Sequence, residues 1–359
     1  MSFFKRWTTL VPVLGAGVLA ATWGRDGGGL VLSVVGLFLA GSVLAAVHHA
    51  EVVAHRVGEP FGSLILAVAV TVIEVALIVT LMVSGGPETA SLARDTVFAA
   101  VMITCNGIVG LSILVGAIRQ TQALFNAEGT ATALATVATL ATLSLVLPRF
   151  TTSRPGPEFS PEQLAFAAIS SIVLYGLFVF VQTIRHRDYF LPVEVDNTNP
   201  ESHAGPPSNR ETFLSLSLLV VALVAVVGLA KTGSPAIQAA VRAIGAPLSA
   251  AGVIIALLVL LPETLAAVRN ARRDRIQTSL NLALGSAMAS IGLTIPTLVV
   301  ATIWLDGPLL LGLEATQIVL LAITVVVGSF TIPSGRATVQ EGGIYLVLFG
   351  AFLFLAINP

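Results

Sequence analysis

The 359-residue sequence has little charge. Lys, Arg, Asp and Glu make up 10% of it, whereas hydrophobic residues make up 55% and the mean hydropathy is +0.94. So few charged residues cannot form the solvated surface of a soluble domain. The formal net charge of −1 favours neither a nucleic-acid partner nor an acidic solubilising shell. The composition therefore predicts a membrane protein whose surroundings are a lipid bilayer.

The sequence also lacks the motifs of several enzyme classes. No His-Glu-x-x-His, Gly-x-Ser-x-Gly, phosphate-loop or dinucleotide-loop pattern occurs in it. The one cysteine, Cys105, cannot form an internal disulfide and leaves the redox compartment undetermined. We therefore expect no cofactor and no catalytic residues.

Long apolar runs are present instead. A helix needs about 20 mainly apolar residues to cross the hydrocarbon core of a bilayer. Segments of near-spanning length lie at 8–22, 29–47, 60–84, 96–118, 129–147, 164–184, 212–230, 246–268, 277–304, 309–328 and 342–357. The sequence predicts an all-α polytopic membrane protein with about eleven transmembrane helices.

Lys and Arg are distributed unevenly over the loops between these segments. If the N-terminus is cytoplasmic, twelve of the 18 basic residues lie on cytoplasmic loops, four of them between residues 269 and 275. By the positive-inside rule we expect a cytoplasmic N-terminus and an external C-terminus in the cell inner membrane. In this orientation the segment at 60–84 runs outward and the segment at 246–268 runs inward.

Two carboxylates interrupt the apolar runs. Glu74 lies near the middle of the segment at 60–84, and Glu263 lies late in the segment at 246–268. An ionised carboxylate at bilayer depth costs about 3 kcal/mol on insertion scales, so such a residue usually faces a polar interior and has a function. A neutral glutamic acid that bonds across helices is the alternative. Because two matched instances occur, we predict that both residues bind metal cations and protons.

The order of the segments indicates an internal repeat. An extra N-terminal helix at 1–28 precedes five segments at 29–184, a polar linker at 185–211 and five further segments at 212–359. Each set of five carries its glutamate in its second segment. Odd-numbered repeats are inverted relative to one another, which brings equivalent helices together near the bilayer midplane. We therefore predict two inverted five-helix repeats in which the two glutamates meet.

Oxygen-bearing residues near the glutamates complete the predicted site. Asn106 lies in the middle of the next span, and Thr71 lies one turn before Glu74. Pro262 has no N–H, so the carbonyl of Leu258 loses its helical partner. Hard oxygen ligands of this kind suit Na⁺, K⁺ or Ca²⁺.

Hydroxyl groups follow the second glutamate. Ser286, Ser290 and Thr294 recur every four residues, so they share one helical face. They are further candidates for the cation site. The alternative is that these hydroxyls bond their own backbone or hold helices together.

The sequence around these residues resembles that of a known family. The resemblance rests on four stretches: HAEVVAHRVGEPFGSLILAVAVTVIE (49–74), QALFNAEGT (122–130), LLPETLAAVRNARRDRIQTSLNLALGSAMASIGLTIP (260–296) and SGRATVQEG (334–342). Over nearly its whole length the chain resembles the cation/proton exchangers (CAX branch) of the calcium:cation antiporter superfamily, most closely the bacterial ChaA type. The resemblance implies a secondary transporter, not an enzyme, that works by alternating access and exchanges a cytoplasmic cation for a proton.

The chain also departs from this family. Plant and fungal members carry Gly-Asn-x-x-Glu at each glutamate, whereas the Gly and Asn positions here hold Val70 and Thr71 in the first half and Val259 and Leu260 in the second. An amide ligand is therefore missing from each half. Fewer oxygen ligands weaken selectivity for Ca²⁺, so Na⁺ and K⁺ stay open as further cargo.

Charge accounting links the cation to the proton. Two bare carboxylates in a low-dielectric site are unfavourable because both are desolvated and they repel each other. Two protons or one divalent cation neutralise the pair, and so does a monovalent cation with one proton. We therefore predict an antiporter that exports Ca²⁺ in exchange for H⁺. A monovalent-selective Na⁺(K⁺)/H⁺ antiporter is the alternative.

A histidine-rich stretch allows a different interpretation. His48, Glu51 and His55 lie at helical spacing near the end of a span, and such residues could ligate zinc in an intramembrane hydrolase. No complete metalloprotease motif accompanies them, which favours a regulatory or pH-sensing role, since imidazole titrates near neutrality. A passive cation channel is a second alternative. The sequence leaves the oligomeric state undetermined.

Overall fold

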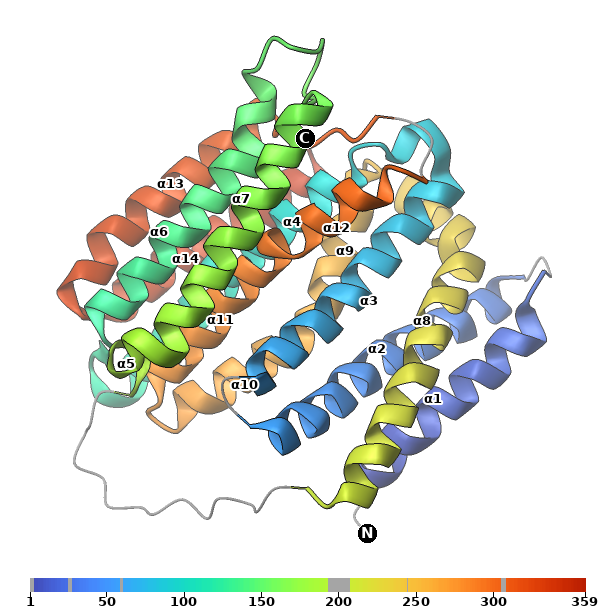
Figure 1. Cartoon of the computed structure of the whole chain (residues 1–359), viewed down its shortest axis with the longest axis horizontal. Coiled ribbons are helices and arrows are strands. Elements are labelled where there is room, and N and C mark those ends of the chain that lie inside the picture. The colour runs from blue at the N-terminus through green and yellow to red at the C-terminus, as the bar shows by residue number, and fades with distance from the viewer. Residues whose placement is uncertain (1–2, 25–27, 59–60, 193–206, 244, 305–307) are drawn as a thin grey trace. The chain divides into compact units, whose positions relative to one another are not determined.

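The computed structural model describes residues 3–24, 28–58, 61–192, 207–243, 245–304 and 308–359 (Figure 1). Over these residues the chain is almost entirely helical. It divides into two compact units, one formed by residues 1–89 and 198–251 and the other by residues 90–197 and 252–359.

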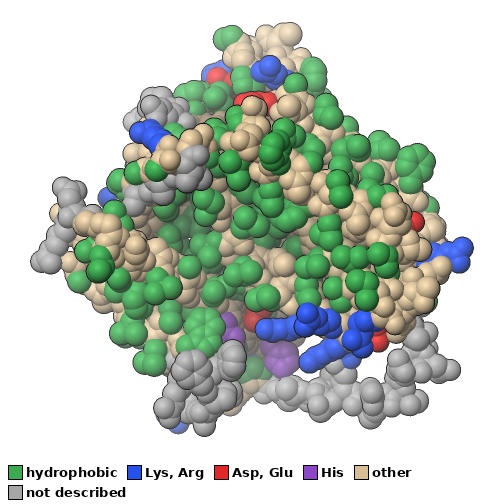
Figure 2. Space-filling view, turned by 180° about the vertical axis from the view of Figure 1, so that it is seen from behind, with side chains coloured by type: hydrophobic (Ala, Val, Ile, Leu, Met, Phe, Trp, Pro, Cys, Tyr) green, Lys and Arg blue, Asp and Glu red, His purple; other side chains and the backbone are tan. Residues whose placement is uncertain are grey.

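The helices have the length and composition of membrane spans. Nine helices within the described residues are long and apolar enough to cross a bilayer, and one bent pair forms a further candidate. The N-terminal apolar helix, Trp7–Thr22, is shorter. Hydrophobic side chains are spread over the face shown in Figure 2, and the charged side chains on it lie mainly toward its edges. The predicted all-helical polytopic fold is therefore confirmed.

The first unit is a bundle of long helices. It contains α1 (Phe3–Thr22), α2 (Gly29–Val57), α3 (Phe61–Gly85), the short 3₁₀ turn η1 (Gly86–Thr89), α8 (Asn209–Ala243) and the start of α9 (Ser249–Val259). Helix α2 packs against α1, α3 and α8. Small residues allow a close approach, since a Cβ at Gly41 would lie 2.9 Å from Val11 Cγ1. Such contacts hold membrane helices together.

Helix α8 is longer than the apolar run that predicted it. The predicted segment ended at residue 230, before the polar residues Lys231 and Thr232, whereas the helix continues to Ala243 with Pro235 inside it. The polar residues end the apolar run but do not end the helix.

The second unit contains the remaining elements. In its first part these are α4 (Leu92–Met102), the π-helical turn η2 (Ile103–Ile108), α5 (Val109–Gln120), β1 (Ala123–Leu124), α6 (Ala127–Ala141), the turns η3 (Thr142–Val146) and η4 (Leu147–Arg149), α7 (Pro161–Phe180), η5 (Val181–Arg185) and η6 (Arg187–Phe190). In its second part, after the rest of α9, these are α10 (Leu261–Arg272), α11 (Ile276–Gly292), α12 (Thr294–Ala301), α13 (Ala315–Thr331), η7 (Ile332–Ser334), β2 (Arg336–Ala337) and α14 (Val339–Ile357).

The span formed by α4, η2 and α5 is the centre of the second unit. Of its most apolar window 89% is buried within the protein, compared with 22% for α14. Gly110 allows α14 to approach, since a Cβ there would lie 2.7 Å from Tyr345 Cβ. Because this span is enclosed by other helices, polar side chains on it face protein rather than lipid.

Two predicted spans are interrupted. The segment at 246–268 divides at Leu260 into α9 and α10, which are bent by 49°. The segment at 277–304 divides at Leu293 into α11 and α12. The length of an apolar segment does not show where the helix within it is interrupted.

The short strand pair joins two of the stretches that carry the family resemblance. Strand β1 pairs antiparallel with β2, with Ala123 opposite Ala337 and Leu124 opposite Arg336. Each stretch then begins a helix, since Asn126 caps α6 and Thr338 caps α14 through their side-chain oxygens. Part of each stretch therefore has a structural role, which is to cap the N-terminus of a helix.

The predicted linker at 185–211 falls largely on residues 193–206, which lie outside the described residues. Before them, η6 is attached to the second unit, because Asn281 Nδ2 donates to the Phe190 carbonyl at 2.6 Å. The division into repeats at 29–184 and 212–359 remains a prediction.

Candidate functional site

Glu263 lies at the start of a helix. Helix α9 ends at Val259, Leu260 has φ −87° and ψ 0°, and Pro262 lies in the first turn of α10. Proline is tolerated there because the first N–H groups of a helix have no intrahelical acceptor. The Glu263 side chain is buried, with 6% exposure. The positive end of the helix dipole stabilises a carboxylate at this position.

Pro262 also leaves a backbone carbonyl without its helical donor. The carbonyls of Ala256 and Leu260 accept hydrogen bonds from Leu260 N and Thr264 N, each at 2.9 Å. The residue four positions after Leu258 is Pro262, which has no N–H to donate. Leu258 therefore remains a predicted ligand.

Asn106 lies on the π-helical turn η2 in the centre of the second unit. Its side chain is fully buried, and Nδ2 donates to Thr324 Oγ1 at 2.9 Å. The Thr324 hydroxyl donates to the Leu320 carbonyl at 2.7 Å, so its oxygen can only accept from the amide. This arrangement fixes the orientation of the amide group.

The fixed orientation leaves the amide oxygen available. Asn106 Oδ1 is buried and accepts no hydrogen bond from any residue that the structure describes. A buried oxygen without a donor requires an explanation, and a hard cation supplies one. Single-turn π-helices also occur frequently at functional sites. Asn106 is therefore the predicted ligand that the local geometry supports most directly.

The hydroxyl residues after Glu263 do not lie on one continuous helix. Ser290 and Thr294 are buried, and Ser286 is partly exposed. Helix α11 ends at Gly292, and Thr294 is the first residue of α12. The interruption at Leu293 falls between Ser290 and Thr294, within one candidate span over Ile276–Ala301, and the shared face of the three hydroxyls remains a prediction. Helices α10 and α11 and the turn η2 do pack against one another.

Glu74 and Thr71 lie in the first unit, on α3. This helix is unbroken from Phe61 to Gly85, in contrast to the divided α9 and α10. Both side chains are buried, with exposures of 2% for Glu74 and 6% for Thr71. Glu263 belongs to the second unit, and the convergence of the two carboxylates remains a prediction.

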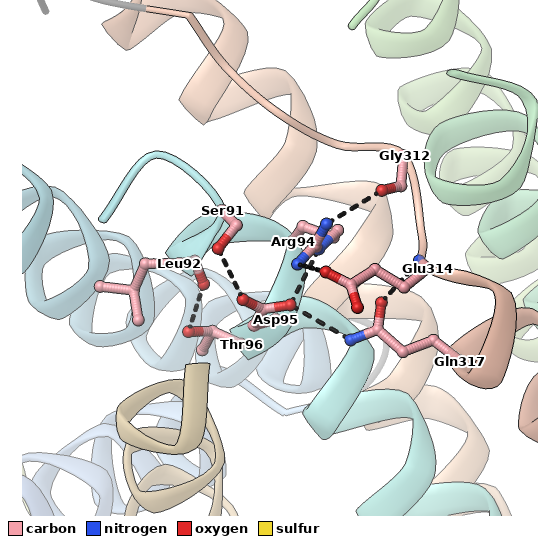
Figure 3. A network of polar contacts seen from close by, with 8 residues as sticks. All are labelled: Ser91, Leu92, Arg94, Asp95, Thr96, Gly312, Glu314 and Gln317. Carbon is pink, nitrogen blue, oxygen red and sulfur yellow. Dashed lines mark hydrogen bonds and ion pairs between the residues drawn. The ribbon is translucent and has the colours of Figure 1, made fainter. Parts of the chain in front are cut away.

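A buried ion pair at the start of α4 was not predicted from the sequence (Figure 3). Arg94 Nε lies 2.8 Å from Asp95 Oδ1, and both side chains are buried. Arg94 also donates to the Gly312 carbonyl at 3.2 Å and to Glu314 Oε1 at 3.3 Å, and Gln317 Nε2 donates to Asp95 Oδ1 at 3.2 Å. The network joins α4 to the start of α13. Its only sequence signal is an Arg-Asp pair at the edge of an apolar run.

The histidine-rich stretch of α2 does not form the proposed zinc site. Glu51 and His55 are exposed and His48 is partly buried. The neighbouring His49 is the buried ring, with Nε2 3.0 Å from the Thr8 carbonyl. No group of three or more His, Cys, Asp or Glu residues in the described part of the chain could hold a metal ion. A regulatory role for His48, Glu51 and His55 remains a prediction.

A family model covers most of the chain. The model described as sodium/calcium exchanger protein matches residues 28–184 and 214–358. The resemblance drawn from the sequence stretches around the glutamates is therefore confirmed.

Individual relatives match over almost the whole chain. It is 44% identical over 356 residues to the putative ionic transporter y4hA of Sinorhizobium fredii, covering 98% of this chain and 96% of that protein. It is 32% identical over 354 residues to the sodium-potassium/proton antiporter ChaA of Escherichia coli, and the match covers 97% of this chain and 95% of that protein. The crystal structure of the H⁺/Ca²⁺ exchanger CAX superposes with a TM-score of 0.72 at 14% identity, covering 97% of this chain and 86% of that one, and supports the fold alone.

These matches argue against the two alternatives, an intramembrane hydrolase and a passive channel. The chain belongs to the sodium/calcium exchanger family of the calcium:cation antiporter superfamily, and it is a multi-pass secondary transporter of cations and not an enzyme.

Proposed function

We propose that this protein is a cation/proton antiporter that exports Ca²⁺ in exchange for H⁺, with Na⁺ and K⁺ open as further cargo. The observation that carries the proposal is the pair of buried carboxylates, Glu74 and Glu263, each in the second span of a region that matches the family model. Buried carboxylates in membrane spans typically mark ion pathways and proton relays.

The proposed cation site combines these carboxylates with neutral oxygens. The amide oxygen of Asn106 is supported by its burial and its fixed orientation. The further proposed ligands are the carbonyl of Leu258 and the hydroxyls of Thr71, Ser286 and Ser290. A set of carboxylate, carbonyl and hydroxyl oxygens matches the preference of Ca²⁺ and of alkali cations for hard ligands.

The carboxylate pair would couple the two fluxes. One Ca²⁺ neutralises two carboxylates, and so do two protons, whereas the bare pair is disfavoured by desolvation and repulsion. A monovalent cation together with one proton gives the same total charge. If only neutralised forms change between inward-facing and outward-facing states, each cation that leaves is replaced by protons.

The proposed mechanism is alternating access between two inverted repeats. The family model matches the chain twice, over 28–184 and 214–358, which supports two equivalent halves. The uneven distribution of Lys and Arg supports a cytoplasmic N-terminus and an external C-terminus in the inner membrane. In this arrangement the site lies near the bilayer midplane and opens to each side in turn.

A monovalent-selective Na⁺(K⁺)/H⁺ antiporter is the second candidate. Its support is the 32% identical relative, which is named a sodium-potassium/proton antiporter. The apolar residues Val70, Val259 and Leu260 near the two glutamates also reduce the number of oxygens available to Ca²⁺.

Transport in proteoliposomes separates the two candidates. Purified protein is reconstituted with an acidic interior that contains a pH-sensitive dye, and Ca²⁺, Na⁺ or K⁺ is added outside. The proposal predicts a rise of internal pH with Ca²⁺, whether or not Na⁺ and K⁺ also give one. A response to Na⁺ and K⁺ but not to Ca²⁺ selects the second candidate. No response to any cation contradicts both.

A further inference from the structure

We propose that Ser112 and Ser279 position the Glu263 helix against the π-helical turn that carries Asn106, and that this positioning sets the affinity of the transport site for its cation. The inference rests on the proposed function, because it concerns the same site.

The two serines form a buried hydrogen-bonded chain in the second unit. Ser112 lies on α5 and Ser279 on α11, and neither side chain is exposed to solvent. Their Oγ atoms are 2.7 Å apart. Ser112 Oγ is also 2.7 Å from the Ile108 carbonyl oxygen, and Ser279 Oγ is 2.7 Å from the Ala267 carbonyl oxygen.

These two carbonyls belong to the elements that carry the predicted ligands. Ile108 is the last residue of the turn η2, two residues after Asn106. Ala267 lies on α10 one turn after Glu263, which is about 6 Å along the helix axis. The serine pair therefore connects the backbone next to the amide ligand with the backbone next to the carboxylate ligand.

Counting protons shows that the connection has two arrangements. The three contacts share only two hydroxyl protons, since each serine has one. In one arrangement Ser112 donates to Ser279, which donates to Ala267. In the other, Ser279 donates to Ser112, which donates to Ile108. The bond between the serines joins α5 to α11 in both, whereas the bond that reaches α10 through the Ala267 carbonyl forms only in the first arrangement. The proposed positioning therefore belongs to the first arrangement, in which α10 is bonded through the serines to α5, the helix that directly follows η2.

A second serine pair in the same unit serves as the reference for purely structural packing. Ser144 and Ser171 are also buried, and their Oγ atoms are 3.1 Å apart. They join η3 to α7, which carry none of the predicted ligands. Loss of this pair removes the same kind of bond without affecting α10 or η2 directly.

The test compares the two pairs by alanine substitution. Ser112→Ala, Ser279→Ala, the double variant, Ser144→Ala and Ser171→Ala are reconstituted, and initial rates of Ca²⁺-driven proton release are measured over a range of Ca²⁺ concentrations. For a monovalent-selective protein Na⁺ replaces Ca²⁺. The shift of the melting temperature by the same cation in detergent gives a measure of binding that does not depend on transport.

We expect Ser112→Ala and Ser279→Ala each to raise the KM roughly three-fold at unchanged maximal rate, the effect of one buried hydrogen bond between membrane helices. The double variant should equal Ser279→Ala, because that single substitution already removes both the bond between the serines and the bond to the Ala267 carbonyl. Ser144→Ala and Ser171→Ala should leave the KM unchanged. If Ser279→Ala cannot be purified, Ser112→Ala tests the same bond.

Two results would overturn the inference. One is a KM in the Ser112 and Ser279 variants equal to that of the Ser144 and Ser171 variants. The other is a double variant whose effect is the product of the two single effects. Absence of exchange in the unsubstituted protein would instead overturn the proposed function, and this inference with it.

Discussion

The cation ligands that we propose are single buried oxygen atoms. Glu74 and Glu263 are 2% and 6% exposed, so each is removed from bulk water. Asn106 adds a neutral oxygen whose amide group is oriented by Thr324. In the proposed site these residues would supply two charges and one carbonyl-type ligand for the exchange of a cation with protons.

Replacing either glutamate by glutamine tests the role of charge at this scale. Glu74→Gln and Glu263→Gln keep the size of the side chain but remove the charge and the titrating group. Loss of one partner from a buried charged site costs about 2–5 kcal/mol, so cation affinity should fall by roughly 30-fold or more. Exchange in proteoliposomes should drop to background while the protein still inserts.

Glu128→Gln is the matched control for these variants. Glu128 is exposed at the start of α6 and should tolerate the change with normal exchange. Near-normal transport in Glu74→Gln would refute the assignment of the carboxylate pair.

Asn106 can be separated from its hydrogen-bond partner. Asn106→Ala removes the amide oxygen, and because bonds to charged groups contribute about 1.5–3 kcal/mol, the apparent KM for the cation should rise about ten-fold or more. Thr324→Val keeps this oxygen and removes the acceptor for Nδ2 together with the hydroxyl bond to the Leu320 carbonyl, so its effect on the KM should be smaller. Equal effects of both variants in the same transport assay would indicate a packing role for Asn106.

The sequence identifies these residues but not their geometry. Glu74, Glu263 and Asn106 stand out because each is a polar residue within an apolar run. The orientation of the Asn106 amide oxygen depends on the hydrogen bond from Nδ2 to Thr324, which is 218 residues away in the chain. No local pattern could have predicted that contact.

At the scale of elements, interruptions of helices distinguish this fold from a plain bundle. The break at Leu260 places Glu263 in the first turn of α10, and the π-helical turn η2 places Asn106 in the centre of its span. The sequence indicated that Pro262 frees a carbonyl, but it did not indicate the 49° bend between α9 and α10.

Restoring the missing N–H tests the function of this break. Pro262→Ala provides a donor for the Leu258 carbonyl and favours a continuous helix. We expect a cation affinity lower by about ten-fold, the equivalent of roughly 1.4 kcal/mol. Pro235→Ala in α8 is the control, because it also removes a proline from a helix but lies far along the chain from the predicted ligands. Unchanged affinity in Pro262→Ala would show that the break has no role in binding.

Substitutions in the Arg94 network test how strongly it holds α4 to the start of α13. Arg94→Ala leaves Asp95 as an uncompensated buried charge, so the free energy of unfolding should fall by about 3–5 kcal/mol. A double variant with Asp95→Ala should recover part of this loss. Arg154→Ala, which removes an exposed partner of Glu158, should cost less than about 1 kcal/mol. Thermal unfolding in detergent measures all three, and equal losses in the single and double Arg94 variants would contradict the account.

At the scale of the whole molecule, apolar segment length predicted the fold class and most of the spans. Nine helices within the described residues have the length and composition of spans, and the bent pair and the shorter N-terminal helix correspond to the two remaining segments. The ends of the elements were less predictable, because a helix can continue through polar residues, as α8 does.

The orientation in the membrane can be tested by labelling. Cys105 is buried, and Cys105→Ala gives a background without cysteine. In this background Asn358→Cys and Arg336→Cys place thiols at two exposed positions. We expect a membrane-impermeant maleimide added to intact cells to label Asn358→Cys at once and Arg336→Cys only after permeabilisation. The opposite pattern would reverse the proposed topology.

The measurement that tests the central claim most directly is a cross-link between the two glutamate positions. In the Cys105→Ala background, Glu74→Cys and Glu263→Cys are combined, and a protease site is inserted in the predicted linker at 185–211. After treatment with a short thiol cross-linker and cleavage, the two halves should remain joined only when both cysteines are present. Halves that separate equally with one or both cysteines would contradict a shared site of Glu74 and Glu263.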